Sequence, residues 1–162
     1  MKKKFALTLV SLASVALLAA CGEVSTTGNS GSASGTEIGK TLKIGFNFEE
    51  TGATAAYGTA EQKGAQLAVD EINKAGGVDG KQIEVTDKDN KSELSEASTV
   101  STNLVTQAKV NTIIGPATSG GTGAAITNAA KASVPLITPS GTQDDLTKGQ
   151  DYLFRTTFID SF

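Results

Sequence analysis

The sequence has no histidine, no tryptophan and a single cysteine among its 162 residues. Without histidine, the chain has no Ser-His or Cys-His catalytic pair and no histidine-ligated metal site. One cysteine excludes an internal disulfide and a cysteine-cluster metal site. A formal net charge of −3 and an aromatic content of 5% disfavour nucleic-acid binding, which needs a basic face and stacking platforms. We therefore predict no nucleic-acid partner, no metal and no cofactor.

The first twenty residues are organised as a secretory signal peptide. Residues 1–4 read Met-Lys-Lys-Lys, and residues 5–18 are mostly apolar. Because a membrane-spanning helix needs about 20 apolar residues, this segment fits a cleaved signal better than a span. An uncleaved N-terminal anchor helix is the alternative.

The signal-like segment ends in Leu-Ala-Ala-Cys at residues 18–21. This motif resembles the lipobox of bacterial lipoproteins, in which the signal is cut before the cysteine and the cysteine sulfur carries a diacylglyceryl group. The resemblance implies that Cys21 is a lipid anchor and that the protein lies on the extracytoplasmic face of the cell membrane. Cleavage leaves 11 basic and 17 acidic residues, so the mature chain carries a formal charge of −6.

Residues 21–40 are rich in glycine, serine and threonine and show no apolar periodicity. Such a segment buries too little surface to offset the entropy lost on ordering. We therefore predict a flexible tether between the lipid anchor and a folded domain at 41–162.

Strand and helix patterns alternate from residue 41 onward. Alternating or continuous apolar runs predict strands near 42–47, 83–86, 112–115, 134–137 and 152–154. Helical spacing predicts helices at 55–74, 92–108 and 124–132, with Ser92 as the cap of the second. This alternation predicts an α/β fold, with a parallel sheet and helices on both faces.

The first predicted helix has one apolar stripe and several charged positions. The stripe is expected to face the core, and its members are Ala60, Gly64, Leu67, Ala68 and Ile72. Glu61 is expected to face water, with Lys63, Asp70 and Lys74.

Ligands of such sheets bind at the carboxyl ends of the strands, which directs attention to the loops 48–57, 87–92, 116–122 and 138–145. The glycine-rich segment 115–123 follows a buried strand and opens a helix. Its free N–H groups suit either an anion site or an ordinary helix cap with nothing bound. The segment 138–142 likewise suits a hydroxyl-lined site or a capped turn.

Two acidic segments also follow strands. Glu49 and Glu50 are adjacent, and neighbouring side chains of an extended segment point apart, so we interpret them as solvated loop charges and not as a catalytic pair. Asp87 and Asp89 lie in an oxygen-rich segment that lacks the spacing of a calcium-binding loop.

Five blocks resemble the first part of the leucine/isoleucine/valine-binding protein family, the solute receptors of ABC amino-acid importers. They are KIGFNFEETGATAAYG (43–58), GAQLAVDEINKAGGVDGKQIEV (64–85), IIGPATSG (113–120), VPLITPSGT (134–142) and FRTTFIDSF (154–162). The resemblance implies the Rossmann-like first lobe of a type I periplasmic binding protein, a binding protein and not an enzyme.

The same resemblance implies roles for individual residues. Ser119 and Thr142 match hydroxyl residues that bind the amino acid's carboxylate. Ser140 matches the position whose backbone carbonyl takes the ammonium, and Gly141 lies beside it. The resemblance further implies pocket-wall roles for an aromatic and two small residues, Tyr57, Ala117 and Thr118.

The sequence departs from the family pattern in two places. Much of the family reads closer to Pro-Leu-Thr-Gly where this chain has Glu49, Glu50, Thr51 and Gly52. The chain also ends where family members are about to cross into a second lobe, so we expect an incomplete first lobe, with an exposed apolar face and an unpaired strand edge.

The resemblance implies a receptor that captures a small, branched-chain type of amino acid and delivers it to an ABC permease in the membrane. Because half a cleft leaves the ligand exposed, we expect weak or absent binding by the 162-residue chain. Two alternatives stay open: a receptor-like sensory module and a non-functional truncated product. A hydrolase would need a Ser-Lys or carboxylate device, and the sequence has no Ser-x-x-Lys motif.

Overall fold

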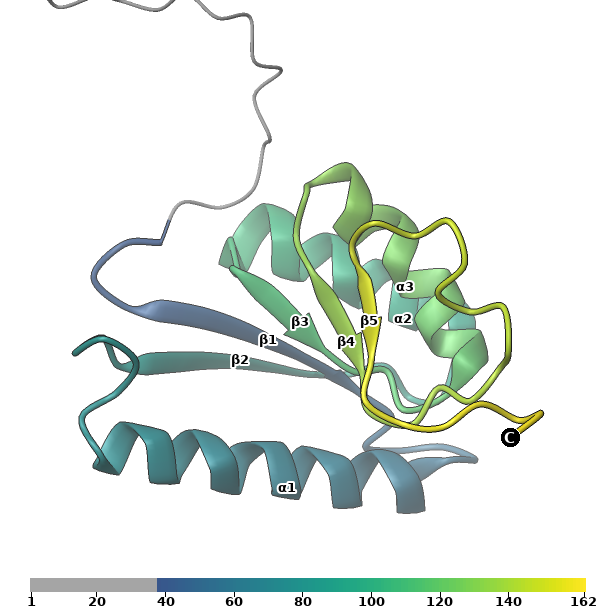
Figure 1. Ribbon diagram of the computed structural model, residues 1–162, viewed down its shortest axis with the longest axis horizontal. Helices are drawn as coiled ribbons and strands as arrows, with labels where there is room; N and C mark the ends of the chain where they lie inside the picture. Colours follow the sequence, from purple (N-terminus) through teal and green to yellow (C-terminus); the bar gives the residue numbers. More distant parts are fainter. Residues whose placement is uncertain (1–37) are drawn as a thin grey trace, which may run out of the picture. The chain divides into compact units, whose positions relative to one another are not determined.

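Five parallel strands form one sheet in the computed structural model, which describes residues 38–162 (Figure 1). The order across the sheet is β2-β1-β3-β4-β5. The bounds are β1 Leu42–Phe48, β2 Ile83–Asp89, β3 Thr112–Ile114, β4 Leu136–Thr138 and β5 Leu153–Arg155. The predicted signal peptide, the Cys21 anchor and most of the predicted tether lie outside the described residues.

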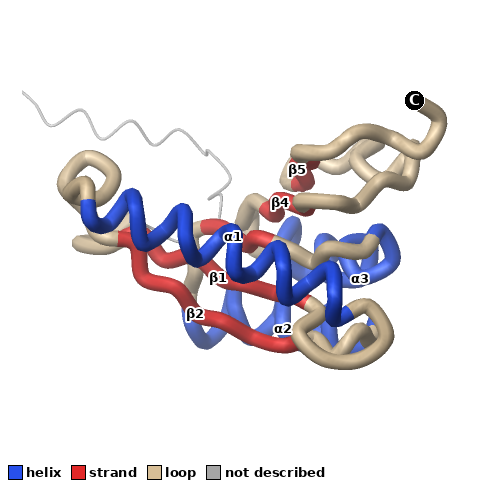
Figure 2. Tube along the Cα trace, turned by 90° about the horizontal axis from the view of Figure 1, so that it is seen from below, coloured by secondary structure: helices blue, strands red, loops and turns tan. Residues whose placement is uncertain are grey.

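Helices cover both faces of the sheet, as Figure 2 shows. Helix α1 (Ala55–Lys74) lies over β1 and β2 on one face. Helix α2 (Leu94–Asn103), the π-helical turn η1 (Leu104–Ala108) and helix α3 (Ser119–Lys131) lie on the other face. The predicted α/β class is therefore confirmed. No helix among the described residues combines the length and the apolar character that a membrane crossing requires.

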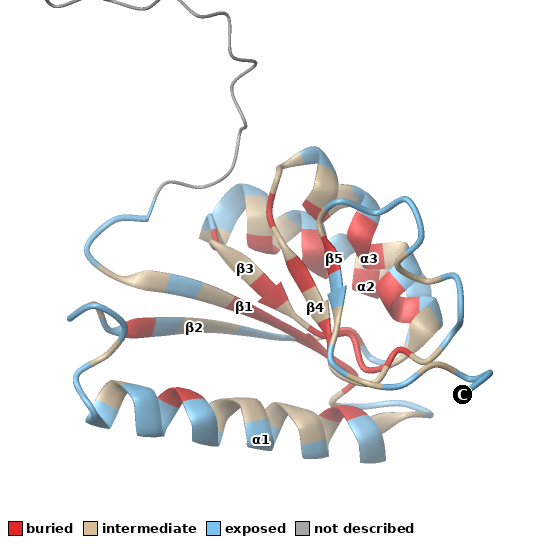
Figure 3. Cartoon of the chain, viewed as in Figure 1, coloured by how far each residue is buried: buried red, intermediate tan, exposed pale blue. Residues whose placement is uncertain are grey.

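Two apolar clusters hold these layers together, and buried positions concentrate along the sheet (Figure 3). The smaller cluster joins α1 to β1 and β2 through Phe46, Phe48, Val69 and Ile83. The larger one joins α2, η1 and α3 to β3, β4 and β5, and its fully buried members include Leu104, Ile113, Ala125, Ala129 and Leu136. Its short apolar strands have the pattern of parallel strands covered on a face by helices.

The prediction that the apolar stripe of α1 faces the core is wrong. Leu67 is 60% exposed, and the other four stripe residues are exposed as well. Helix α1 instead turns Gly58 and Val69 toward the sheet. The reason is a close approach at the start of the helix, where a Cβ on Gly58 would lie 2.3 Å from the backbone oxygen of Glu49. Only glycine allows this contact, and it sets which face of α1 is buried.

Two predicted helix starts also differ from the structure. Helix α2 begins at Leu94 after an extended Glu93, and Ser92 does not cap it. Helix α3 begins at Ser119 instead of residue 124, because the Thr118 side chain accepts a hydrogen bond from the Gly121 N–H. This cap starts the helix within the glycine-rich segment, where intrinsic propensity alone disfavours a helix.

In the described part of the chain, no helix lies over one part of the sheet (Figure 2). On the face that carries α1, Ile114, Ile137 and Phe154 occupy neighbouring positions in adjacent strands. Helix α1 reaches β1 and β2, and Phe154 on β5 is 52% exposed. Strand β5 also has no partner on its outer side within the described residues. Within residues 38–162 the expected unpaired edge is present, whereas the expected apolar face is exposed at Phe154 and half-buried at Ile114 and Ile137.

Candidate binding site

A pocket of about 420 Å³ opens where the carboxyl ends of the strands meet the start of α1. Its volume falls within the range of roughly 300–1,000 Å³ that is typical of small-molecule sites. The loops after β1, β3, β4 and β5 and the first turns of α1 and α3 line it, with the residues Thr54, Tyr57, Ala117, Thr118, Ser119, Ser140, Thr142, Thr157 and Phe158. Six of the seven ligand-binding residues predicted from the sequence are therefore brought together, and their roles toward a ligand stay predictions.

Gly141 is the predicted residue that does not line the pocket. It is buried, and its N–H donates to Thr138 Oγ1 at 3.0 Å. A Cβ at this position would lie 2.7 Å from a methyl group of Leu146 and 2.8 Å from Thr138 Oγ1. Gly141 thus lets the loop after β4 pass close to its own strand, which places Ser140 and Thr142 at the pocket.

Glu49 is a buried carboxylate and not the solvated loop charge that we predicted. Its side chain accepts hydrogen bonds from the N–H groups of Ala117 and Thr118, at 2.9 and 3.2 Å. The Thr118 hydroxyl adds a third bond of 2.8 Å. The residue is 1% exposed. Glu49, at the end of β1, therefore fixes the loop after β3 that forms one wall of the pocket.

This arrangement bears on the two interpretations left open for the glycine-rich segment. The segment does cap a helix, and part of its N–H donor set is already used by the protein's own Glu49. The N–H groups of Ser119 and Gly120 come before the first hydrogen bond of the helix backbone, which Thr122 donates to Thr118. These two donors are directed toward the N-terminal end of α3, where the helix dipole favours an anion.

Side-chain donors stand beside these N–H groups. Ser119 Oγ accepts from the Gln143 N–H at 3.1 Å, which leaves its own hydrogen free to donate. The Thr142 side chain has no hydrogen-bond partner within the described residues, and the Ser140 backbone carbonyl accepts no bond there either. The pocket thus offers two hydroxyl donors and one carbonyl acceptor.

Glu61 stands one helical turn after Tyr57 and contacts Ser140. Ser140 Oγ is within hydrogen-bond distance of Glu61 Oε1 and lies 2.9 Å from the Ala117 carbonyl oxygen. The other Glu61 oxygen, Oε2, is buried and has no partner. Burial and the charge of Glu49 raise the pKa of Glu61, and a hydrogen bond acts in the opposite direction only if Ser140 is its donor. The prediction that Glu61 faces water is therefore wrong.

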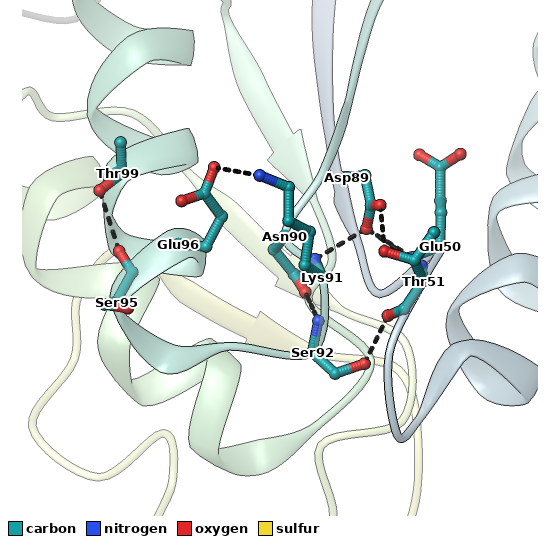
Figure 4. Close-up of polar contacts among 9 residues, drawn as sticks. All are labelled: Glu50, Thr51, Asp89, Asn90, Lys91, Ser92, Ser95, Glu96 and Thr99. Carbon is teal, nitrogen blue, oxygen red and sulfur yellow. Dashed lines mark hydrogen bonds and ion pairs between the residues drawn. The ribbon is translucent and has the colours of Figure 1, made fainter.

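The loop 87–92 does not line the pocket but braces the loop that does (Figure 4). The Asp89 carboxylate accepts from the N–H groups of Glu50 and Thr51 and from the Thr51 hydroxyl. Ser92 Oγ donates to the Thr51 carbonyl at 2.7 Å and accepts from the Thr54 N–H at 3.1 Å. Ser92 therefore ties two loops together instead of capping α2.

The pKa values of two carboxyl groups in these loops are shifted in opposite directions. Burial raises the pKa of Asp89, but the hydrogen bonds from Thr51, Lys91 and Glu50 outweigh it and lower the pKa overall. Burial, with a hydrogen bond and repulsion from Asp87 and the charge of Asp89, raises the pKa of Glu50 to about 7. No group of three or more acidic or cysteine side chains in residues 38–162 is arranged to hold a metal ion.

Sequence reasoning missed three residues of the pocket. Thr54 follows β1, and Thr157 and Phe158 follow β5. The strand-end rule that selected the other loops would have selected Thr157 and Phe158 if applied to the fifth strand. Phe158 and Tyr57 are 66% and 67% exposed, so the pocket has two open aromatic residues at its mouth.

The sequence profile described as "Periplasmic binding protein" matches residues 41–161. The chain belongs to the periplasmic binding protein family. This family is extracytoplasmic, and the assignment agrees with the parallel sheet and with a pocket at the carboxyl ends of its strands.

Two solved structures support the fold. The branched-chain amino acid transporter substrate binding protein LivJ from Streptococcus pneumoniae, solved in complex with isoleucine, is 76% identical, with a TM-score of 0.75 over 75% of this chain and 35% of that one. An ABC transporter substrate-binding protein from Desulfitobacterium hafniense, in complex with Leu, is 26% identical, with a TM-score of 0.65 over 74% of this chain and 35% of that one.

Curated relatives agree with this family. The leucine-, isoleucine-, valine-, threonine-, and alanine-binding protein of Pseudomonas aeruginosa is 34% identical over 122 residues, which are 75% of this chain and 32% of the relative. The chain thus spans about a third of the length of the curated relatives that it matches. These relatives are binding proteins and not enzymes, which confirms the prediction on that point.

Proposed function

We propose that the chain supplies the first lobe of the solute-binding component of an ABC importer for amino acids, of the branched-chain type. One observation carries the proposal. The pocket sets hydroxyl and N–H donors at the start of α3 close to an unused carbonyl of the loop after β4. This pairing of donors and acceptor suits the carboxylate and the ammonium of one α-amino acid.

Each part of the ligand has a proposed partner. Ser119 and Thr142 donate to the carboxylate, and the Ser140 carbonyl accepts from the ammonium. Tyr57 and Phe158 cover the apolar side chain at the mouth of the pocket. Hydrogen bonds that involve a charged group contribute about 1.5–3 kcal/mol each when water is excluded.

A second lobe is needed to exclude water from the bound ligand. Both aromatic residues at the pocket mouth are about two-thirds exposed, so a ligand held here alone keeps one side in water. We expect the complete receptor to close over the ligand and to present it to a permease. The 162-residue chain alone should then bind weakly, with a Kd above about 1 mM, or not at all.

Saturation-transfer NMR on the full chain tests the proposed ligand class, because it detects weak binding. Isoleucine, leucine and valine should receive saturation, whereas analogues that lack either the ammonium or the carboxylate should not. Ser119→Ala should abolish the effect. The matched control is Thr127→Ala, an exposed hydroxyl on the same helix, which should leave it unchanged. If the analogue without an ammonium and the analogue without a carboxylate both receive as much saturation as isoleucine, the proposal is contradicted.

The proposed membrane location has its own test. We propose that Cys21 carries the lipid anchor of the mature protein. Mass spectrometry of the protein from its membrane fraction should show an N-terminal, diacylglyceryl-modified Cys21. An unmodified cysteine, or a chain that keeps residues 1–20, would contradict this part of the proposal.

A further inference from the structure

The hydrogen bonds around Ser140 need more hydrogens than one hydroxyl has. Ser140 Oγ contacts Glu61 Oε1 on one side and the Ala117 carbonyl oxygen on the other. A hydroxyl has one hydrogen to donate, and a backbone carbonyl can only accept. If Ser140 donates to Ala117, Glu61 has to be the donor in the other bond, and a carboxyl group donates only when it is protonated.

The surroundings of Ala117 favour this direction. Ala117 is 2% exposed, and among the described residues Ser140 is the one donor to its carbonyl oxygen. If Ser140 turned toward Glu61, that oxygen would be buried without a partner, which costs about 1–3 kcal/mol. The Ala117 N–H is meanwhile held by Glu49, so the peptide units on both sides of Ala117 are fixed.

The second oxygen of Glu61 points to the same protonation state. Glu61 Oε2 is buried and accepts no hydrogen bond. An unpartnered oxygen is far less costly on a neutral carboxylic acid than on a carboxylate, because burial penalises charge most strongly.

The charged groups around Glu61 offer it no compensating cation. Glu49, from the end of β1, is the charged side chain whose field acts on it, and this charge repels a second carboxylate. Arg155 of β5 donates to the carbonyls of Gly141 and Gln143. Neither ion pair in the described part of the chain includes Glu61.

We propose that Glu61 is a positioning residue of the pocket in its protonated form, donating to Ser140 Oγ so that Ser140 donates onward to the Ala117 carbonyl. This chain of two hydrogen bonds joins α1, the loop after β4 and the loop after β3. It fixes two walls of the pocket relative to each other. Ionisation of Glu61 removes the donor and releases one of the two bonds.

A ligand-free pH titration of the full chain by NMR tests the proposal. With carbon-labelled glutamate, the Glu61 carboxyl should titrate above pH 4.5, the ordinary pKa of a glutamate side chain. Glu71, an exposed glutamate on the same helix, supplies the control variant. The backbone amides of Thr118 and Gly141 should move with the Glu61 midpoint. A Glu61 midpoint at or below pH 4.5 would overturn the proposal.

Two substitutions separate positioning from a merely structural role. Glu61→Gln replaces the protonated carboxyl by an amide that also donates, so its Thr118 and Gly141 amides should stay at the low-pH wild-type positions at every pH. Glu71→Gln should leave the wild-type titration unchanged. Amides of the Glu61→Gln variant that match the high-pH wild-type form would overturn the proposal.

The consequence for ligand affinity rests on the proposed function. The Kd for isoleucine should rise by roughly 2- to 10-fold as the wild type passes the Glu61 midpoint, the equivalent of one lost hydrogen bond, and stay constant in Glu61→Gln. A failure of both proteins to bind at any pH would count against the proposed function. The ligand-free titration decides the role of Glu61 in either case.

Discussion

Glu49 shows how a single side chain links the sheet to the pocket. Its side chain is 1% exposed and accepts three hydrogen bonds from donors of one loop, so its buried oxygens are satisfied. The Thr118 hydroxyl extends this hydrogen-bond chain to α3, since it donates to Glu49 and accepts from the Gly121 N–H. One residue thus determines both the pocket wall and the start of α3.

Truncation of the Glu49 side chain should therefore destabilise the folded chain. Glu49→Ala leaves the Ala117 and Thr118 N–H groups without an acceptor, and we expect it to lower the free energy of unfolding by about 3 kcal/mol. Urea unfolding followed by circular dichroism measures this loss. The neighbour Glu50 is the matched control, because it is half-buried and accepts no hydrogen bond from the loop after β3. Glu50→Ala should change stability by less than about 1 kcal/mol.

Glu50 should instead be visible in the pH dependence of stability. Its pKa is raised from 4.5 to about 7, so between these pH values the folded chain binds more protons than the unfolded chain. The free energy of unfolding contributed by Glu50 therefore falls as pH rises through this range. Because the group is partly exposed, the change should stay below about 1 kcal/mol.

The comparison of Glu50→Gln with wild type isolates this effect. The variant should gain stability relative to wild type as pH rises from 4.5 to 7, as measured by urea unfolding at several pH values. A difference that is constant with pH, or one that shrinks as pH rises, would contradict the raised pKa.

At the residue scale the sequence identified four of the six serine and threonine residues of the pocket, Thr118, Ser119, Ser140 and Thr142, but misplaced Glu49 and Glu61. Ser119, Ser140 and Thr142 follow strands, so the strand-end rule located them together with the family resemblance. The burial of Glu49 depends on a loop 68 residues away, and no local pattern contains that information. The same reason explains why Glu61, which depends on Ser140, was expected to face water.

The bounds of the helices and strands were predicted best where the local sequence pattern determines them. Helix α1 has the predicted bounds, and four of the five strands lie within two residues of the predicted positions, whereas β2 extends three residues beyond its predicted end. The errors fall where tertiary contacts override local preference. The Thr118 cap starts α3 among glycines, and the approach of Gly58 to Glu49 rotates α1 away from its apolar stripe.

The packing of α1 gives a matched pair of glycine substitutions. Gly58→Ala should destabilise the fold by about 3 kcal/mol, because the added Cβ would meet backbone atoms of Glu49 at 2.3 Å. Gly64, on the same helix, has nothing within 4 Å of its added Cβ. Gly64→Ala should therefore stabilise the helix by up to about 1 kcal/mol. Thermal unfolding checks both, and equal effects would contradict the close packing at Gly58.

Across residues 38–162 as a whole, part of the sheet is left uncovered. Ile114, Ile137 and Phe154 form a row across β3, β4 and β5 on the face of α1, in which Ile114 packs against the cluster around Val69, Ile137 is half-buried and Phe154 is 52% exposed. Exposed apolar sheet surface next to an open edge strand favours association and dye binding. The described chain should therefore bind a fluorescent hydrophobic dye in its native state.

Phe154→Ser should lower this dye fluorescence. The matched control is Phe162→Ser, because Phe162 is a fully exposed aromatic residue outside the sheet. Fluorescence that falls equally in both variants, or in neither, would contradict the assignment of the dye site to the uncovered face.

We propose that an amino acid binds in the loops after β3 and β4 of this lobe. An isoleucine titration of the full chain, followed by backbone amide NMR, tests this binding site. We predict shifts concentrated at Ser119, Gly120, Gly141 and Thr142, with a Kd above about 1 mM. Shifts centred elsewhere would contradict the site, and micromolar binding by this chain alone would contradict the need for a second lobe.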